Sequence, residues 1–186
     1  FFTSDNGPWT WMGAETGGSA GLLRDGKGST WEGGMRVPGI AWWPGRVQPG
    51  VTTQVATMMD LFPTFVKLAG TTVPADRPLD GIDLSPLLLR AESLERDVFC
   101  YYRGTRLFAA RLGPWKAHFF TQGSYGDPKV VPHDPPLLFN LEVDPSEAHD
   151  VADRHPEVVT RIAAAVARHR ANIVAAPSQL IETVAK

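Results

Sequence analysis

Residues 26–38 read GKGSTWEGGMRVP. Lys27 stands between two glycines, so its ammonium group sits on a backbone that can approach an anion closely. The spacing is not that of a Walker A motif, because no Ser or Thr follows the lysine directly, and nucleotide binding is therefore disfavoured. A solvated loop lysine remains the alternative on these residues alone. Among the charges of this stretch, we expect an ion pair of Glu32 with Arg24 or Arg36 that fixes the loop.

A short apolar strand and a polar turn open the chain, as FFTS followed by DNGP at residues 5–8. Asp5 and Asn6 offer a carboxylate and an amide oxygen at the carboxyl end of this strand, and such hard donors suit Ca²⁺ or Mg²⁺. The same residues are also ordinary turn formers, so the local sequence leaves both readings open. Because the strand enters at Phe1 with nothing upstream to pair with it, we expect the chain to be the C-terminal part of a larger protein.

The composition excludes several classes of protein. The 186 residues are 43% hydrophobic and 20% charged, which is typical of a folded globular chain. A net charge of −2 gives no basic footprint for nucleic acid, and no apolar run is long enough for a membrane span. The single cysteine, Cys100, rules out an internal disulfide and a cysteine-rich zinc site. The lone thiol leaves the compartment open.

Glycines and prolines dominate the first half of the chain, so residues 5–36 are expected to be mostly loop. The apolar run at 37–43 predicts a buried strand, and residues 51–59 an extended segment. Asp60 is expected to cap a helix that ends at Gly70 and packs on a sheet. Residues 71–86 look like a linker. We therefore expect two units, residues 1–75 and residues 76–186.

The second unit shows strand patterns separated by turn signals, followed by one long helical pattern. Pro156 suits the first turn of that helix, which we expect to run to Ile173. The strands are expected to form an antiparallel meander. They lie at residues 98–102, 106–112, 115–121 and 137–141.

Histidines and tryptophans supply further candidates for a pocket. His133, in the expected loop 131–136, is the histidine that we carry as a substrate-binding candidate, and Trp9 and Trp11 are candidate pocket residues in the glycine-rich loops. Trp31 shares this loop environment. His149 is expected to be solvated. The remaining histidines are expected to be structural, namely His118, His155 and His169. The remaining tryptophans are expected to be in the core, namely Trp42, Trp43 and Trp115.

These motifs together resemble the C-terminal signature of type I sulfatases in the alkaline phosphatase superfamily, with most likeness to the branch of arylsulfatase A and N-acetylgalactosamine-6-sulfatase. The likeness rests first on TSDNG at 3–7 and on residues 26–38. It continues in order through DLFPT at 60–64, DGIDLSPLL at 80–88, KAHFFTQGS at 116–124 and PPLLFNLEVDPSE at 135–147. It implies the C-terminal part of an α/β sulfatase fold, followed by a small antiparallel sheet with a packing C-terminal helix.

The resemblance also implies roles for named residues. Asp5 and Asn6 match the family's ligands to a divalent cation, usually Ca²⁺, and Lys27 matches the lysine that contacts the sulfate group. The expected substrate is an aryl or carbohydrate sulfate ester, as a small molecule or a glycan. A periplasmic, secreted or lysosomal-type location is compatible with the family.

The family's nucleophile is a formylglycine made from a Cys or Ser in a Cys/Ser-x-Pro/Ala-x-Arg motif, and no such motif surrounds Cys100. We therefore expect the nucleophile, further metal ligands and the acid histidines on an upstream part of the same protein, and the 186-residue chain to be inactive alone. Two alternatives stay open: a phosphatase or phosphonate hydrolase of the same superfamily, and a non-catalytic binder of sulfated glycans. A serine hydrolase is disfavoured, because no Gly-x-Ser-x-Gly elbow occurs.

Overall fold

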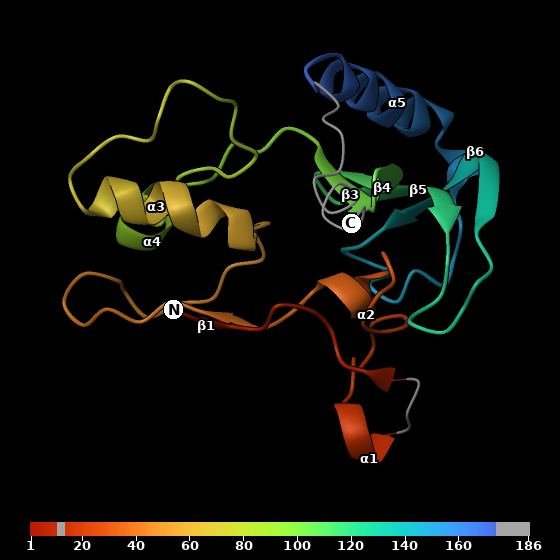
Figure 1. The fold of residues 1–186 in the computed structure, drawn as a ribbon, viewed down its shortest axis with the longest axis horizontal. Coiled ribbons are helices and arrows are strands. Elements are labelled where there is room, and N and C mark those ends of the chain that lie inside the picture. The colour runs from red at the N-terminus through yellow and green to blue at the C-terminus, as the bar shows by residue number, and fades with distance from the viewer. Residues whose placement is uncertain (11–13, 174–186) are drawn as a thin grey trace, which may run out of the picture.

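The computed structural model describes residues 1–10 and 14–173 (Figure 1). Its first part is dominated by irregular backbone, as the sequence predicted for residues 5–36. Strand β1 (Phe2–Thr3) pairs antiparallel with β2 (Gly39–Ile40). Among the described residues between them lie two short α-helices, α1 (Ala14–Gly17) and α2 (Glu32–Met35).

A helix pair follows, in which the 3₁₀ turn η2 (Met58–Asp60) leads into α3 (Leu61–Leu68), with α4 (Ser85–Arg90) beside it. The segment at 51–59, expected to be extended, forms no strand, and its last two residues belong to η2. Among the described residues α3 contacts η2 and α4, and its Phe65 ring lies 5.3 Å from the ring of Phe1, which precedes β1, so the expectation that α3 packs on a sheet stays a prediction. Asp60 anchors this arrangement instead of capping α3 with its side chain. Its fully buried carboxylate accepts bonds from the backbone nitrogens of Thr57 (2.6 Å) and Ile82 (2.8 Å).

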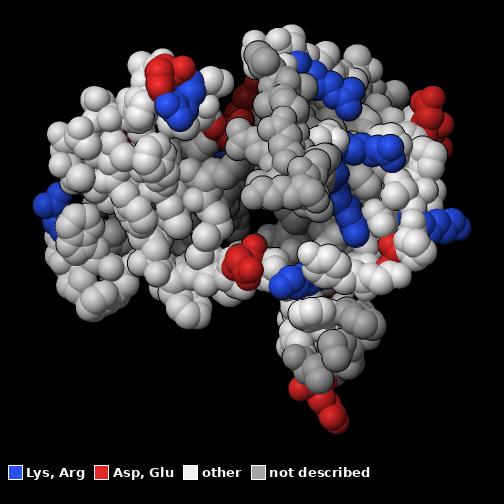
Figure 2. Space-filling view, viewed as in Figure 1, with Lys and Arg blue, Asp and Glu red and all other residues white. Residues whose placement is uncertain are grey.

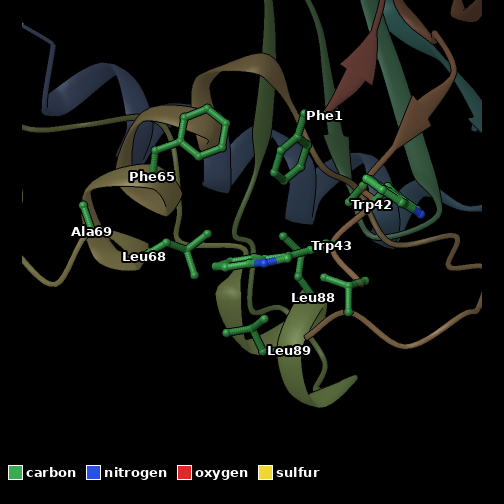
Figure 3. Close-up of a pocket in the computed structure, with 10 residues that line it drawn as sticks. Phe1, Trp42, Trp43, Phe65, Leu68, Ala69, Leu88 and Leu89 are labelled. Atoms are coloured by element: carbon green, nitrogen blue, oxygen red, sulfur yellow. The ribbon is translucent and has the colours of Figure 1, made fainter. Parts of the chain in front are cut away.

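The prediction of a buried strand at residues 37–43 was wrong. Only two of its residues are in β2, and Trp42 is 80% exposed, because β2 pairs with β1 alone among the described strands and no layer covers it. Trp43 was also expected in the core but is 43% exposed. Together with α3 and α4 it borders an open apolar groove of about 380 Å³ (Figure 3). The side of the molecule over α3 and α4 carries few charged side chains (Figure 2).

The second part is a four-stranded antiparallel sheet in the order β3-β4-β5-β6. Helix α5 (Pro156–Ala171) covers one face of it, and Leu107, Leu138 and Ile162 lie in the core between them. The predicted sheet and C-terminal helix are thus confirmed. No helix of the described residues is long and apolar enough to cross a membrane. The strands are β3 (Phe99–Arg103), β4 (Arg106–Leu112), β5 (Trp115–Thr121) and β6 (Val131–Asn140).

Strand β6 is longer than the sequence predicted and includes the stretch 131–136 that we expected to be a loop. Its prolines, Pro132, Pro135 and Pro136, argue against a central strand because they lack a backbone N–H. They are tolerated here because β6 is an edge strand with one neighbour, β5. His133 therefore lies on a strand at the sheet's edge.

Candidate functional site

The backbone of the Lys27 loop lies directly against the turn at residues 5–8. The Lys27 N–H donates to the carbonyl oxygen of Pro8 at 2.8 Å, and the Gly7 N–H donates to that of Gly34 at 3.0 Å. A Cβ on Gly7 would lie 1.8 Å from the Gly33 carbonyl oxygen, so only glycine allows this approach. Two stretches about twenty residues apart in sequence are thus held together by main-chain contacts.

Asp5 and Asn6 follow β1 directly, at the position expected from the sequence. Asn6 donates from Nδ2 to the Gly7 carbonyl oxygen at 3.2 Å, which leaves its amide oxygen as the remaining polar atom of the side chain. Asp5 is exposed, and no hydrogen bond or ion pair within the described residues engages its carboxylate. These two hard oxygen donors fit part of a Ca²⁺ or Mg²⁺ coordination sphere. The described ranges contain no group of three or more His, Cys, Asp or Glu that could hold a metal, so Asp5 and Asn6 stand as candidate ligands.

The Lys27 side chain is half-buried, and its Nζ lies 5.2 Å from the centroid of the Trp9 ring. Over residues 1–10 and 14–173, no carboxylate forms an ion pair with it, so the ammonium group is open to an external anion. Trp9 itself is 41% exposed. The other pocket candidate of this loop, Trp11, lies outside the described residues.

The loop that follows β5 docks on the Lys27 loop. The Tyr125 N–H donates to the Lys27 carbonyl oxygen at 3.3 Å, and the Ser124 N–H donates to Asp25 Oδ2 at 3.0 Å. A segment of the C-terminal sheet therefore borders the candidate anion site.

His133 lies near the base of this docking loop. Its Nε2 pairs with the hydroxyl of Thr121, the last residue of β5, at 2.8 Å. Burial lowers the pKa of His133, although Asp150 acts in the opposite direction. No hydrogen bond or ion pair within the described part of the chain joins His133 to Lys27. The structure thus brings the Lys27 loop and the turn carrying Asp5 and Asn6 together, and connects His133 to them only through the β5 loop.

Glu32 anchors the loop, but not through either ion pair that the sequence predicted. Its carboxylate lies 2.8 Å from Lys116 Nζ and 3.8 Å from a terminal nitrogen of Arg111. Arg24 instead donates to the carbonyl oxygen of Glu147 at 2.9 Å and lies over the Trp31 ring. The correction has a physical cause, since both new partners come from the C-terminal part of the chain and are invisible to local sequence patterns.

Glu147 completes a buried charged cluster with Glu32, Lys116 and His118, none of which is more than 2% exposed. The Glu147 carboxylate lies 3.1 Å from Lys116 Nζ and 2.7 Å from His118 Nε2, and it accepts the Glu32 N–H at 2.6 Å. Burial opposes ionisation of Glu147, but the His118 hydrogen bond and the Lys116 charge outweigh it and lower its pKa. The cluster fastens the start of α2, just after the Lys27 loop, to β5.

His118 is structural, as its place on a strand suggested. Burial lowers the pKa of His118 to about 4, despite the opposing effect of Glu147, so the ring is neutral at pH 7. Trp31 packs on this ring with a centroid distance of 4.2 Å and is 5% exposed. Trp31, which shares the loop environment of the candidates Trp9 and Trp11, is therefore part of the core.

Local sequence reasoning missed the partners that hold the site. Lys116 and His118 alternate along β5, so both point to one face of the sheet, and that alternation was the available signal. The sequence gives no comparable signal for Glu147 or Tyr125, because each lies among turn residues.

Comparisons with known proteins cover both parts of the chain. A model described as "Sulfatase" matches residues 1–71, and one described as "C-terminal region of aryl-sulfatase" matches residues 94–185. Arylsulfatase A of Bos taurus is 46% identical over 184 residues, covering 89% of this chain and 36% of the relative. N-acetylgalactosamine-6-sulfatase of Homo sapiens is 42% identical over 204 residues, covering 97% and 39%.

Solved structures agree with these matches. The PsFucS1 sulfatase from Pseudoalteromonas sp. superposes with a TM-score of 0.82 at 30% identity, covering 92% of this chain and 36% of its own. The chain thus spans little more than a third of the relatives it matches. From the two family models and from the sheet and helix shared with a solved sulfatase, we conclude that the chain belongs to the sulfatase family and corresponds to its C-terminal region.

Proposed function

We propose that this chain is the C-terminal part of an enzyme that hydrolyses aryl or carbohydrate sulfate esters. The observation that carries the proposal is the main-chain contact between the Lys27 loop and the turn that follows Asp5 and Asn6, because it holds the two candidate segments against each other. The names of its relatives support the substrate class, since they include arylsulfatase A and a sulfatase of N-acetylgalactosamine-6-sulfate. One structural relative at 32% identity was solved in complex with a k-i-k-neocarrahexaose.

In this proposal Asp5 and Asn6 bind a divalent cation, Ca²⁺ or Mg²⁺. The cation would supply Lewis-acid stabilisation of negative charge on the sulfate oxygens. Lys27 contacts one of those oxygens and stabilises the charge that develops as the ester bond breaks. Because main-chain bonds to Pro8 and Tyr125 hold the backbone of Lys27, the lysine would need little reorganisation during the reaction.

His133 is proposed to contact the substrate from the sheet side. Its lowered pKa keeps the imidazole neutral at neutral pH, so it would act as a hydrogen-bonding group rather than as a cation. The bond to Thr121 fixes the orientation of the ring.

The nucleophile, a formylglycine, is proposed to lie on an upstream part of the protein outside these 186 residues. We place the division between the catalytic unit and the small C-terminal unit at about residue 75. On this division of labour, the 186-residue chain alone is inactive.

The test is to replace Lys27 in the complete protein. Lys27→Ala should lower kcat/KM for 4-nitrophenyl sulfate by at least about 100-fold, the usual cost of losing one preorganised charge-stabilising donor. Lys67→Ala is the matched control, because Lys67 is an exposed lysine on α3 and should leave kcat/KM unchanged. A loss below about threefold would remove Lys27 from the site.

Two further assays separate the alternatives. Faster turnover of 4-nitrophenyl phosphate than of the sulfate would favour a phosphatase, and binding of sulfated glycans that survives Asp5→Ala without any turnover would favour a non-catalytic binder. Robust turnover by the 186-residue chain alone would contradict the proposed division.

A further inference from the structure

Two exposed aromatic side chains stand beside Lys27. Trp9 is 41% and Tyr125 50% exposed, and their ring centroids are 6.2 Å apart at an interplanar angle of 46°. Trp9 comes from the turn that follows the candidate metal ligands, and Tyr125 from the loop between β5 and β6. Half-exposed aromatic rings beside a lysine side chain present flat apolar surface on which the ring of a ligand can pack.

The loop that carries Tyr125 is held in place at several points. Backbone N–H groups of this loop donate to Lys27 and Asp25. Within the loop, the Asp127 carboxylate also accepts the Gly123 N–H at 3.0 Å and the Lys129 N–H at 2.8 Å. Arg103 also donates to the Gly123 carbonyl oxygen at 3.1 Å. A surface that is ordered before a ligand arrives loses less conformational freedom on binding.

The Tyr125 ring lies over the glycine that follows Lys27. A Cβ on Gly28 would meet ring atoms of Tyr125 at 3.0 Å, so one edge of the ring rests on the backbone of the Lys27 loop. In a sulfate ester only one oxygen separates the sulfur from the first carbon of the alcohol. A group that binds this alcohol must therefore lie close to the lysine that contacts the sulfate. Trp9 lies beside the Lys27 side chain, and Tyr125 lies against the backbone of the Lys27 loop.

We propose that Tyr125 is a specificity-determining residue, which forms with Trp9 an aromatic wall that packs against the ring of the substrate's alcohol portion. This inference rests on the proposed function and deepens it, since it names the side chains that contact the ring of the alcohol portion. The C-terminal sheet then contributes directly to substrate selection.

The experiment compares substrate and product binding in the complete protein, with 4-nitrophenyl sulfate as substrate and inorganic sulfate as competitive inhibitor. Tyr125→Ala should raise KM about tenfold with little change in kcat, while the inhibition constant of sulfate, which has no ring, stays within about twofold. Tyr125→Phe should keep KM within about twofold, because it retains the flat ring. Tyr125→Leu should behave like Tyr125→Ala, and it covers the case in which the alanine variant folds poorly.

Tyr102→Ala is the matched control and should change neither constant, because Tyr102 is a 39% exposed tyrosine that pairs with His169 of α5 instead. An unchanged KM in Tyr125→Ala overturns the inference. An equal rise in the inhibition constant of sulfate overturns it too, since Tyr125 would then only support the Lys27 loop. If the unaltered protein does not hydrolyse the ester, the proposed function fails, and this inference with it.

Discussion

At the scale of single residues, the Lys116 ammonium group is enclosed by the carboxylates of Glu32 and Glu147 with no exposed surface of its own. Buried charges are costly to desolvate, and such a cluster need not stabilise the fold more than apolar side chains would. Removing one partner is different, because the remaining charges stay buried without compensation. Glu147 is the member with most partners, since it contacts Lys116, His118 and the start of α2.

Glu147→Ala is therefore expected to destabilise the complete protein by about 3–5 kcal/mol. The shift in the urea midpoint, followed by tryptophan fluorescence, measures it, and Trp31 beside His118 is a reporter close to the change. Glu142→Ala is the control, because Glu142 is an exposed glutamate in the turn after β6, and it should change the free energy of unfolding by less than about 0.5 kcal/mol. A loss below about 1 kcal/mol in Glu147→Ala would mean that the cluster does not secure the loop.

At the scale of elements, the contact between the turn at residues 5–8 and the Lys27 loop depends on Gly7. Gly7→Ala would bring a Cβ to 1.8 Å from the Gly33 carbonyl oxygen, so the two segments would have to separate. If Asp5 and Asn6 bind Ca²⁺, adding Ca²⁺ should raise the melting temperature of the unaltered protein, and Gly7→Ala should abolish this rise. We also expect Gly7→Ala to lower kcat/KM at least about tenfold, because a displacement of about 1 Å at the site has an effect of that size. Both are measurable in the complete protein.

Gly39→Ala provides the control for this change. A Cβ there meets nothing within 4 Å, and Gly39 is a strand residue whose φ is not positive. If Gly7→Ala behaves like Gly39→Ala, the close approach of the two segments has no bearing on the site.

The elements that the sequence predicted well are those with local signals. Strands β4 and β5 and helix α5 began where turn glycines and a proline indicated, and Gly113 has the positive φ (59°) that the β4–β5 turn requires. The run at 37–43 was misjudged because burial depends on which layer covers a strand, and that is not a local property. The full length of β6 was missed because its prolines are tolerated only at an edge.

At the scale of the whole molecule, the candidate site also combines features with local sequence signals and features that depend on distant parts of the chain. Lys27, Asp5 and Asn6 became candidates through compact motifs and the resemblance to sulfatases, and their roles stay predictions. The partners that hold them were not, because the bonds from Glu32 to Lys116 and Glu147 span 84 and 115 residues of sequence. Such pairs become visible only when the fold brings the C-terminal sheet against the loop.

The C-terminal sheet emerges from these contacts as a support for the candidate anion site. The Glu147 cluster, the Asp25 bond to Ser124 and the Tyr125 bond to Lys27 attach it to the loop at three places. These contacts join the two halves of the chain, so that the sheet supports the loop that carries the candidate charged groups.

The most direct test is a crystal structure of the complete protein grown with Ca²⁺ and inorganic sulfate. We predict one cation with the Asp5 carboxylate and the Asn6 amide oxygen at about 2.3–2.6 Å. We also predict a sulfate with one oxygen within about 3 Å of Lys27 Nζ. A cation bound without Asp5 and Asn6, or a sulfate held away from Lys27, would contradict the account.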